Sequence, residues 1–460
     1  MSRPVDRRLR REFYNRCKPS EPLEPGDERY VDLDAPTATG VRVRGVNWVE
    51  KLAAQIELSD EPVCELFTGL PGSGKSTELK RLAQRLGDPD GANLLPILIS
   101  AEDVFDLGNP IDIPDIIFAI LHVTEETLLR AEGKDPETAM QEGYFRRLWS
   151  WLSQTDIELG KGEFAVPEVG KLLLELKTRP SLRERVRKTI STSLSRFLKE
   201  ARDELGVMQG RATHLGHEGL IVIIDSLEKL RGTTSNWDEV LSSAERIFAG
   251  GAPYLRLPVH VLYTIPPALA YRQRFDRVLF IPMIKLRDRE GNRFEPGFQA
   301  AKSILTQRVP SETLTGVMGP SVDKRLERLI EWSGGYPREL VRLLQAALAM
   351  EEWPLSDSDF QRILNEVGDQ YRKLVPANAF AWLARIAVDR YLTVQSSEHH
   401  PEAEQMLTIN AVLRYLNDQD WFDLHPAVRE IPGVAEEVQR LKQQEELRVE
   451  PRPAPTPEKP

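Results

Sequence analysis

One stretch decides the fold of this chain: Cys64-Glu65-Leu66-Phe67-Thr68-Gly69-Leu70-Pro71-Gly72-Ser73-Gly74-Lys75-Ser76-Thr77. An apolar run leads into a glycine-rich turn, and the next residues predict an amphipathic helix that ends near Gly87. Gly69, Gly74, Lys75 and Ser76 match the pattern G-x-x-x-x-G-K-[ST] of a phosphate-binding loop (P-loop). The alternative is a glycine-rich turn that matches by chance. Strand, loop and helix all stand where the motif requires them, which favours the P-loop.

Each part of the motif has a physical reason. Glycines let successive backbone N–H groups turn inward around phosphate oxygens, where a side chain would block the approach. The helix that follows directs its free N–H groups and positive dipole end at the same phosphates. Lys75 would reach the β- and γ-phosphates, and the Ser76 hydroxyl would ligate Mg²⁺. The nucleotide-binding residues predicted in the loop are Gly69, Pro71, Gly72, Ser73, Gly74, Lys75, Ser76 and Thr77.

A second diagnostic segment is Gly219-Leu-Ile-Val-Ile-Ile-Asp225, a run of branched aliphatic residues that ends in an acid. Such a run predicts a strand buried on both faces, whose carboxylate emerges at the edge of the sheet beside the P-loop. Asp225 would hold Mg²⁺, and Glu228 could polarise the attacking water. For Glu228 the alternative is an acid that stabilises a helix N-terminus.

Further apolar runs predict strands at 92–100, 258–266 and 277–285. The strand at 258–266 ends near Thr264, a polar residue that could sense the γ-phosphate if this strand lies between the two already described. Pro282 suggests that the strand at 277–285 is at an edge or ends early. The expected fold class is therefore α/β: a P-loop nucleotide-binding domain with a parallel sheet flanked by helices.

Composition narrows the class of protein. The chain has 460 residues, a net charge of −10 and 41% hydrophobic residues, so two to four domains with sizeable cores are expected. The acidic balance argues against a general nucleic-acid coat, although not against a local basic patch. Two cysteines are too few for a disulfide framework or a zinc site. With neither a signal peptide nor a transmembrane segment visible, we expect a cytoplasmic protein.

The remaining sequence predicts five regions. They are a flexible N-terminal arm (1–28), the P-loop core (29–290) with a helical insertion at about 133–210, a helical lid (291–352), a C-terminal helical or winged-helix-like domain (353–440) and a charged, Pro-rich tail (441–460). Within the insertion we expect one long helix from Ser181 to Leu205. In the C-terminal domain, residues 407–426 predict a helix, a turn and a short strand.

The lid contains a further candidate site, Gly334-Gly335-Tyr336-Pro337-Arg338. The glycines end one helix and Pro337 starts the next, which places Arg338 at a helix N-terminus. A cation there is not stabilised by the helix dipole, so bound phosphate is one explanation and a packing or solvent-exposed role is the other.

Together these motifs resemble ATPases of the STAND and AAA+ type, within the additional-strand (ASCE) P-loop class. The resemblance covers about residues 40–430. The sequences at Leu66–Leu79 and Trp421–Pro426 are similar to those of a group of uncharacterised bacterial AAA-type ATP-binding proteins. It implies that Pro337 approaches the adenine and that Arg338 stands where related ATPases carry a second sensor. The spacing of Asp225 and Glu228 resembles the NACHT-like STAND branch more than the adjacent Asp-Glu pair of AAA+ proteins, which implies slow hydrolysis.

The resemblance implies an ATP-driven conformational switch, a regulatory part of a multi-protein system such as bacterial defence or signalling, with ATP and Mg²⁺ as ligands. Protein partners or a homo-oligomer would read its state. The alternative is a nucleic-acid-associated ATPase of origin-recognition type that uses a winged-helix domain, although the net acidity counts against it. A small-molecule kinase is disfavoured because no arginine-rich lid over an acceptor site is evident.

Overall fold

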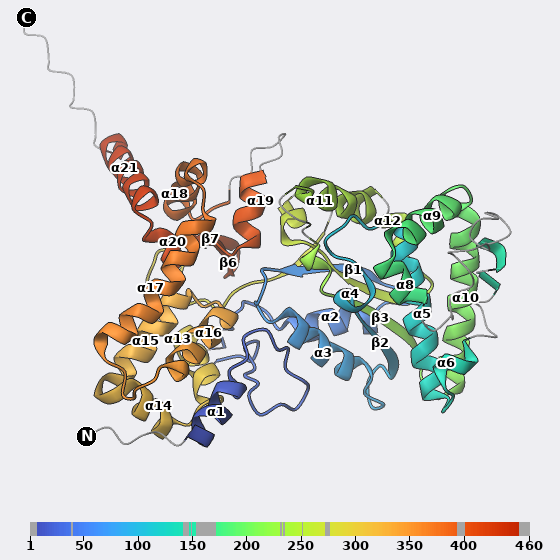
Figure 1. Cartoon of the computed structure of the whole chain (residues 1–460), viewed down its shortest axis with the longest axis horizontal. Helices are drawn as coiled ribbons and strands as arrows, with labels where there is room; N and C mark the ends of the chain where they lie inside the picture. Colours follow the sequence, from blue (N-terminus) through green and yellow to red (C-terminus); the bar gives the residue numbers. More distant parts are fainter. Residues whose placement is uncertain are drawn as a thin grey trace, which may run out of the picture.

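We describe a computed structural model of residues 7–37, 40–140, 147–148, 150–152, 172–230, 232, 235–250, 252–271, 277–392 and 401–449. Figure 1 shows two lobes, one built on a β-sheet and one built mainly from helices, with the N-terminal helix α1 (Arg7–Arg16) against the helical lobe. Among the described helices, none is both long enough and apolar enough to cross a membrane.

The sheet within the described residues has five strands, all parallel, in the order β2-β3-β4-β1-β5. The strands are β1 (Cys64–Gly69), β2 (Leu94–Ser100), β3 (Gly219–Asp225), β4 (His260–Thr264) and β5 (Leu279–Ile281). The predicted strand that ends at Thr264 lies between the P-loop strand β1 and the acidic strand β3, so the expected strand order is confirmed. The predicted edge position of β5 is also confirmed.

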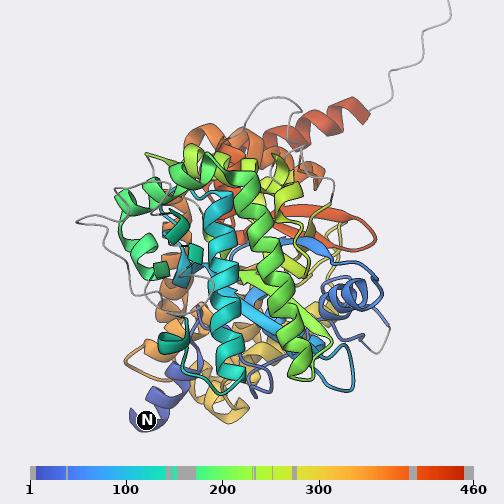
Figure 2. The same cartoon turned by 90° about the vertical axis from the view of Figure 1, so that its right-hand side faces the viewer.

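Different helices cover the two faces of the sheet. Along β3, Ile221 and Ile223 pack with α2 and α3, whereas Leu220, Val222 and Ile224 pack with α5 and α10. Figure 2 shows α5 and α10 side by side in front of the sheet. The helices of this lobe are α2 (Trp48–Glu57), α3 (Lys75–Leu86), α4 (Ala101–Val104), α5 (Ile113–Ala131), α6 (Pro136–Ala139), α8 (Leu172–Thr178), α9 (Pro180–Ser191), α10 (Leu194–His214), α11 (Trp237–Glu245) and α12 (Ala252–Leu255).

The prediction of one long helix from Ser181 to Leu205 was wrong. The segment forms two helices, α9 and α10, because hydroxyl groups compete for the backbone where they meet. The Ser191 hydroxyl donates to Lys188 O and the Thr192 hydroxyl to Thr189 O, both at 2.7 Å. Helix α10 packs on α5 and β3, so the end of the predicted insertion covers the sheet. Residues 141–146, 149 and 153–171 of the insertion lie outside the described residues.

The helical lobe combines the predicted lid and C-terminal domain around one continuous apolar cluster. Its elements are α13 (Glu295–Thr306), α14 (Ser311–Met318), α15 (Val322–Ser333), α16 (Pro337–Ala349), α17 (Asp357–Leu374), α18 (Phe380–Asp389), α19 (Pro401–Thr408), β6 (Val412–Leu416), β7 (Asp420–Leu424), α20 (Pro426–Arg429) and α21 (Pro432–Val449). Helix α21 therefore extends into the predicted tail, of which residues 450–460 lie outside the described part of the chain.

The predicted helix within 407–426 was also wrong. Residues Val412–Leu416 form strand β6, which pairs with β7 in an antiparallel hairpin. Five largely apolar residues fit either a helix or a strand, and the partner strand decides the outcome. The hairpin also contacts the sheet lobe, because Met283 N–H donates to Arg414 O at 2.9 Å and the Lys285 amine donates to Leu416 O at 3.1 Å.

The arm at 1–28 was expected to be flexible, yet its described residues are packed against the protein. Phe13 and Cys17 are buried in the cluster of the helical lobe, and Leu23 is buried near the P-loop. Arg10 Nε donates to Leu348 O at 2.8 Å, and Leu23 N–H donates to the Thr77 hydroxyl at 3.1 Å. The arm therefore joins the lid to the P-loop helix through Phe13, Cys17, Arg10 and Leu23.

Candidate functional site

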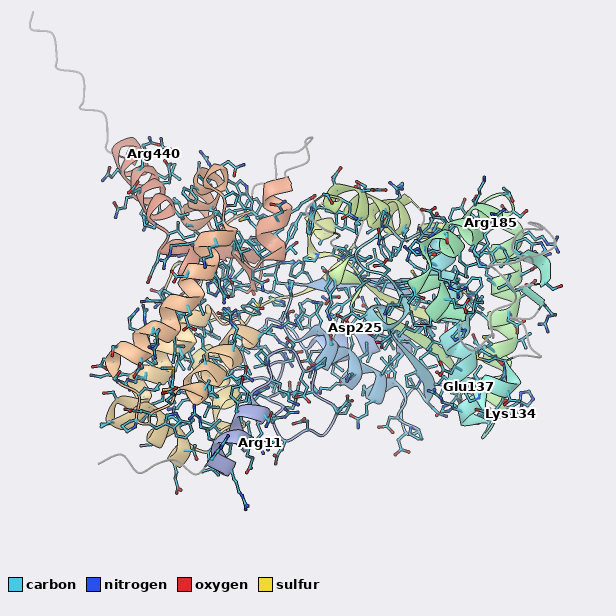
Figure 3. The ribbon with its side chains drawn as sticks, viewed as in Figure 1. Arg11, Lys134, Glu137, Arg185, Asp225 and Arg440 are labelled. Atoms are coloured by element: carbon cyan, nitrogen blue, oxygen red, sulfur yellow. The ribbon has the colours of Figure 1, made fainter. Side chains whose placement is uncertain are left out.

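A pocket of about 330 Å³ lies where the sheet lobe, the helical lobe and the arm meet. Its size is in the range of small-molecule sites. Ten of the predicted residues line it: Gly72, Ser73, Gly74, Lys75, Ser76, Thr77, Asp225, Glu228, Pro337 and Arg338. Figure 3 shows Asp225 near the middle of the molecule, whereas Arg185 and Lys134 lie at the far end of the sheet lobe. The structure thus brings together motifs that are 266 residues apart in the chain, from Gly72 to Arg338.

The P-loop joins β1 to α3 as its motif predicts. Gly74 precedes the first turn of α3 with φ +100°, and Gly72 has φ +83°, both in the left-handed region that favours glycine. Gly69 ends β1 and a Cβ there would collide with Ile281 of β5, so close packing within the sheet requires glycine at this position. Gly69 and Pro71 do not line the pocket surface, and their predicted contact with nucleotide remains a prediction.

Lys75 is buried and folded back on its own loop. Its amine donates to Gly69 O at 3.0 Å and lies 3.1 Å from Glu228 Oε1. The pair compensates two charges that would otherwise be costly to bury. The ion pair holds both side chains in place. An anion that bound in the loop would compete with Glu228 for Lys75.

Asp225 and Glu228 stand on either side of Ser226, which has a left-handed backbone (φ +68°) and starts the 3₁₀ turn η4 (Leu227–Lys229). Burial, and then the Glu228 carboxylate, raise the pKa of Asp225 against a hydrogen bond from the Ser76 hydroxyl. Burial opposes the ionisation of Glu228, but the charge and hydrogen bond of Lys75 lower its pKa. Two buried carboxylates at one site, one hydrogen-bonded to Ser76 and the other paired with Lys75, are candidates for a cation ligand and a general base.

Ser76 and Asp225 could hold Mg²⁺ between them. Mg²⁺ usually keeps several waters and takes only one or two protein oxygens together with substrate phosphates. The Ser76 hydroxyl is already hydrogen-bonded to the Asp225 carboxylate, so both oxygens face one point beside the P-loop. In the described part of the chain, no group of three or more His, Cys, Asp or Glu forms a separate metal site.

Thr264 is fully buried at the end of β4, and its hydroxyl accepts a hydrogen bond from Leu227 N–H at 2.9 Å. Leu227 precedes Glu228, so the threonine holds the turn that carries the carboxylate. Thr264 does not line the pocket. Its predicted sensing of the γ-phosphate would therefore act through the position of η4.

The lid lies directly against the P-loop at Gly72. A Cβ placed on Gly72 would lie 2.6 Å from Tyr336 Cε2 and 2.6 Å from Arg338 Cβ, which shows how closely the two segments approach. Arg338 lies in the first turn of α16, as predicted, and its buried Nε has no hydrogen-bond partner. A guanidinium with an unused donor in the pocket wall is suited to bind a phosphate.

Sequence reasoning missed two sets of contacts around the P-loop. The arm contributes 18–23 to the lining, with Leu23 bonded to Thr77, and no local pattern predicts such a contact. Outside the pocket lining, the C-terminal domain reaches the P-loop through Asn410, whose side-chain amide donates to Pro71 O at 2.9 Å. Asn410 is 4% exposed and has φ +59°. An asparagine near the start of a predicted helix gives no hint that it reaches a loop 339 residues away.

Comparison with known proteins identifies no family. No family model matches the chain, and no curated protein matches it.

Solved structures with a similar arrangement include the ORC1 protein of Aeropyrum pernix in complex with DNA, at 14% identity and a TM-score of 0.32, covering 84% of this chain and 92% of that chain. Cdc6p of Pyrobaculum aerophilum is similar at 10% identity and a TM-score of 0.34, covering 93% and 98% of the two chains. Drosophila ORC bound to DNA is similar at 11% identity and a TM-score of 0.31, covering 92% and 95%. Scores this low assign no function to the present chain.

The class of the fold follows from the chain itself. A P-loop follows β1, an acid ends β3, and β4 lies between these two strands. With helices on both faces and a helical lobe over the loop, this is an α/β P-loop fold of the additional-strand type.

Proposed function

We propose that the protein binds ATP with Mg²⁺ between its two lobes, hydrolyses it slowly, and uses the nucleotide as a conformational switch. The observation that carries the proposal is the hydrogen bond from Asn410 to Pro71 O. Through it the C-terminal domain contacts the apex of the phosphate loop, while Tyr336 and Arg338 of the lid contact the next residue, Gly72. A change at the loop on nucleotide binding or hydrolysis would therefore act on both parts of the helical lobe.

Each side chain has a defined role in this proposal. Backbone amides from Gly72 to Thr77 bind phosphate oxygens, and Lys75 leaves Glu228 to meet the β- and γ-phosphates. Ser76 and Asp225 hold Mg²⁺, which would supply charge neutralisation at the transferring phosphoryl group. Glu228, once released by Lys75, accepts a proton from the attacking water.

The lid supplies the remaining contacts. Pro337, which lines the pocket, approaches the adenine in this proposal, and Arg338 binds a phosphate with the donor that is unpaired in the present arrangement. The Thr264 hydroxyl holds the Leu227 backbone in position, and thereby also positions the neighbouring Glu228. Hydrolysis removes the phosphate that Arg338 contacts and allows the lid to open.

Nucleotide binding is tested by isothermal titration with Mg·ATP. The wild type should bind, Lys75→Ala should not, and Lys134→Ala should bind as the wild type does. Lys134 is a matched control because it lies far from the pocket on the exposed end of the sheet lobe. Equal binding by all three proteins would contradict the P-loop assignment.

The switch is tested at Asn410. Asn410→Ala removes a buried hydrogen bond worth about 0.5–1.5 kcal/mol, so ADP release should accelerate roughly 2- to 13-fold. Asn417→Ala is the control, since Asn417 is exposed in the turn of the same hairpin. Stopped-flow release of a fluorescent ADP measures both variants. The same release rate in both would separate the C-terminal domain from the nucleotide site.

The proposal also implies separate partners, since the motifs of this chain account for a switch and not for an output. A defence or signalling system with a separately encoded effector is one such setting. The Glu228→Gln variant should hold ATP and capture partners or further copies of the chain from its native cells. Identical capture by Lys75→Ala would show that binding does not depend on the nucleotide state.

A second candidate function is that of a nucleic-acid-associated ATPase. The observation that favours it is the order α19, β6, β7 in the C-terminal domain, a helix followed by a two-stranded hairpin as in winged-helix modules. Against it, the hairpin contacts the sheet lobe through Arg414 and Leu416. Retention on duplex DNA that falls steeply between 50 and 200 mM salt, roughly as the phosphate contacts require, would support this function.

A further inference from the structure

Arg44 is a buried arginine in the pocket wall whose binding capacity is not fully used. Its side chain is 0% exposed, Nε donates to Asp34 Oδ1 at 2.7 Å, and Nη2 donates to Glu78 Oε1 at 2.7 Å. The third nitrogen, Nη1, is buried and has no hydrogen-bond partner. A buried donor without a partner costs free energy, so an arginine held in this way calls for an explanation.

The position of Nη1 supplies that explanation. Arg44 lines the same pocket as the P-loop, and Nη1 lies 3.7 Å from the point where a Cβ on Gly74 would stand. The free nitrogen therefore faces the residue that precedes the first turn of α3, where an anion is favoured by both backbone N–H groups and the helix dipole.

The surroundings of Arg44 hold its guanidinium rigidly. Asp34 is fixed in turn by Trp48 N–H, which donates to Asp34 Oδ2 at 3.1 Å. The other oxygen of Glu78 pairs with Arg81 at 3.0 Å, so Glu78 divides its charge between two arginines. Arg44 thus keeps a fixed direction and retains positive charge toward the pocket. A planar guanidinium oriented by two carboxylates is well suited to bind a phosphate oxygen.

We infer that Arg44 is a nucleotide-binding residue, and that its Nη1 donates to a phosphate oxygen of the nucleotide held at Gly74. The inference rests on the proposed nucleotide site and extends it to a residue that lies before the P-loop in the chain. It predicts that Arg44 distinguishes phosphorylated nucleotides from the nucleoside.

The test compares Arg44→Gln with Arg42→Gln. Arg42 is a matched control because it bonds to the backbone oxygen of Asp34, at 2.7 Å, and does not line the pocket. Binding of ADP, the non-hydrolysable analogue of ATP, and adenosine is measured by competition against a fluorescent ADP. Loss of one charge-assisted hydrogen bond should weaken ADP and the ATP analogue roughly 10- to 100-fold and leave adenosine unchanged. Arg42→Gln should change none of the three.

Other outcomes overturn the inference. If adenosine weakens as much as ADP, Arg44 shapes the pocket without binding phosphate. If Arg44→Gln matches Arg42→Gln while the wild type binds ADP and Lys75→Ala does not, the nucleotide site is correct and Arg44 is not part of it. If the wild type fails to bind ADP, the proposed function fails first. Should Arg44→Gln not fold, Arg44→Lys provides the same comparison, with a smaller loss expected for the phosphorylated ligands alone.

Discussion

The contact between the lid and the P-loop can be tested by adding one methyl group. Gly72→Ala places a Cβ 2.6 Å from both Tyr336 Cε2 and Arg338 Cβ, at a backbone φ of +83°. The left-handed backbone costs an alanine about 1–2 kcal/mol, and overpacking adds about 1–3 kcal/mol. Only the overpacking energy arises from contact with the lid, because the backbone strain is present when alanine replaces any glycine of this conformation.

Gly133→Ala separates the two contributions. Gly133 has φ +73° and nothing within 4 Å of its Cβ position, so its substitution carries the backbone strain alone. The excess of Gly72→Ala over Gly133→Ala should be about 1–3 kcal/mol, or roughly a 5- to 150-fold change in the docking equilibrium of the lid. When Tyr336 is also replaced by alanine, the extra destabilisation caused by Gly72→Ala should become smaller, because one of the two colliding groups is absent.

Hydrogen exchange measures this docking locally. The Leu340 amide donates to Tyr336 O at 3.0 Å in the first turn of α16, so its protection reports whether the lid lies on the loop. Gly72→Ala should lower this protection by the factor given above, and Gly133→Ala should leave it unchanged. Equal protection in the two variants, or an excess that persists without the Tyr336 ring, would refute the close contact that we describe.

Three further predictions address the chemistry and the stability of the protein. Glu228→Gln should bind ATP but turn it over roughly 100-fold more slowly or worse, because the general base is lost; unchanged turnover in a phosphate-release assay would remove Glu228 from this role. Thr264→Val keeps the shape of the side chain but leaves Leu227 N–H unsatisfied, so the protein should lose about 1–3 kcal/mol of stability, measured by urea unfolding, and also lose turnover; wild-type values for both would show that the bond is dispensable. Burial, and secondarily Arg342, lower the pKa of His425 to about 3. The unfolded imidazole takes up a proton below about pH 6.5 while the folded one does not, so stability falls as pH falls from about 6.5 to 3; His425→Asn should reduce the loss between pH 7.5 and 5 by about 2 kcal/mol, and an unchanged loss would place the titration elsewhere.

Much of the sheet lobe could be predicted because its signals are local. The P-loop combines a strand, a turn and a helix within fourteen residues, from Cys64 to Thr77. The run that ends at Asp225 is apolar throughout because both of its faces are buried. The position of β4 followed from the expectation that Thr264 stands at the tip of a strand between the other two, and the pairing confirms that strand order.

The parts that could not be predicted depend on tertiary contacts. Nothing near Asn410 indicates that it bonds to Pro71, and nothing near Leu23 indicates that it bonds to Thr77. Nothing near Arg44 indicates that it pairs with Glu78, which lies 34 residues further on. Such contacts arise when separate segments fold onto one another, and local propensity does not encode them.

Hydrogen exchange with and without saturating Mg·ATP tests the central claim most directly. If the nucleotide binds at the P-loop and is read by the helical lobe, ATP should change the exchange of residues 336–349 and 407–416 in the wild type and leave it unchanged in Lys75→Ala. ATP that binds to the wild type without altering exchange in either segment would contradict the account, because the contacts at Gly72 and Pro71 would then transmit nothing.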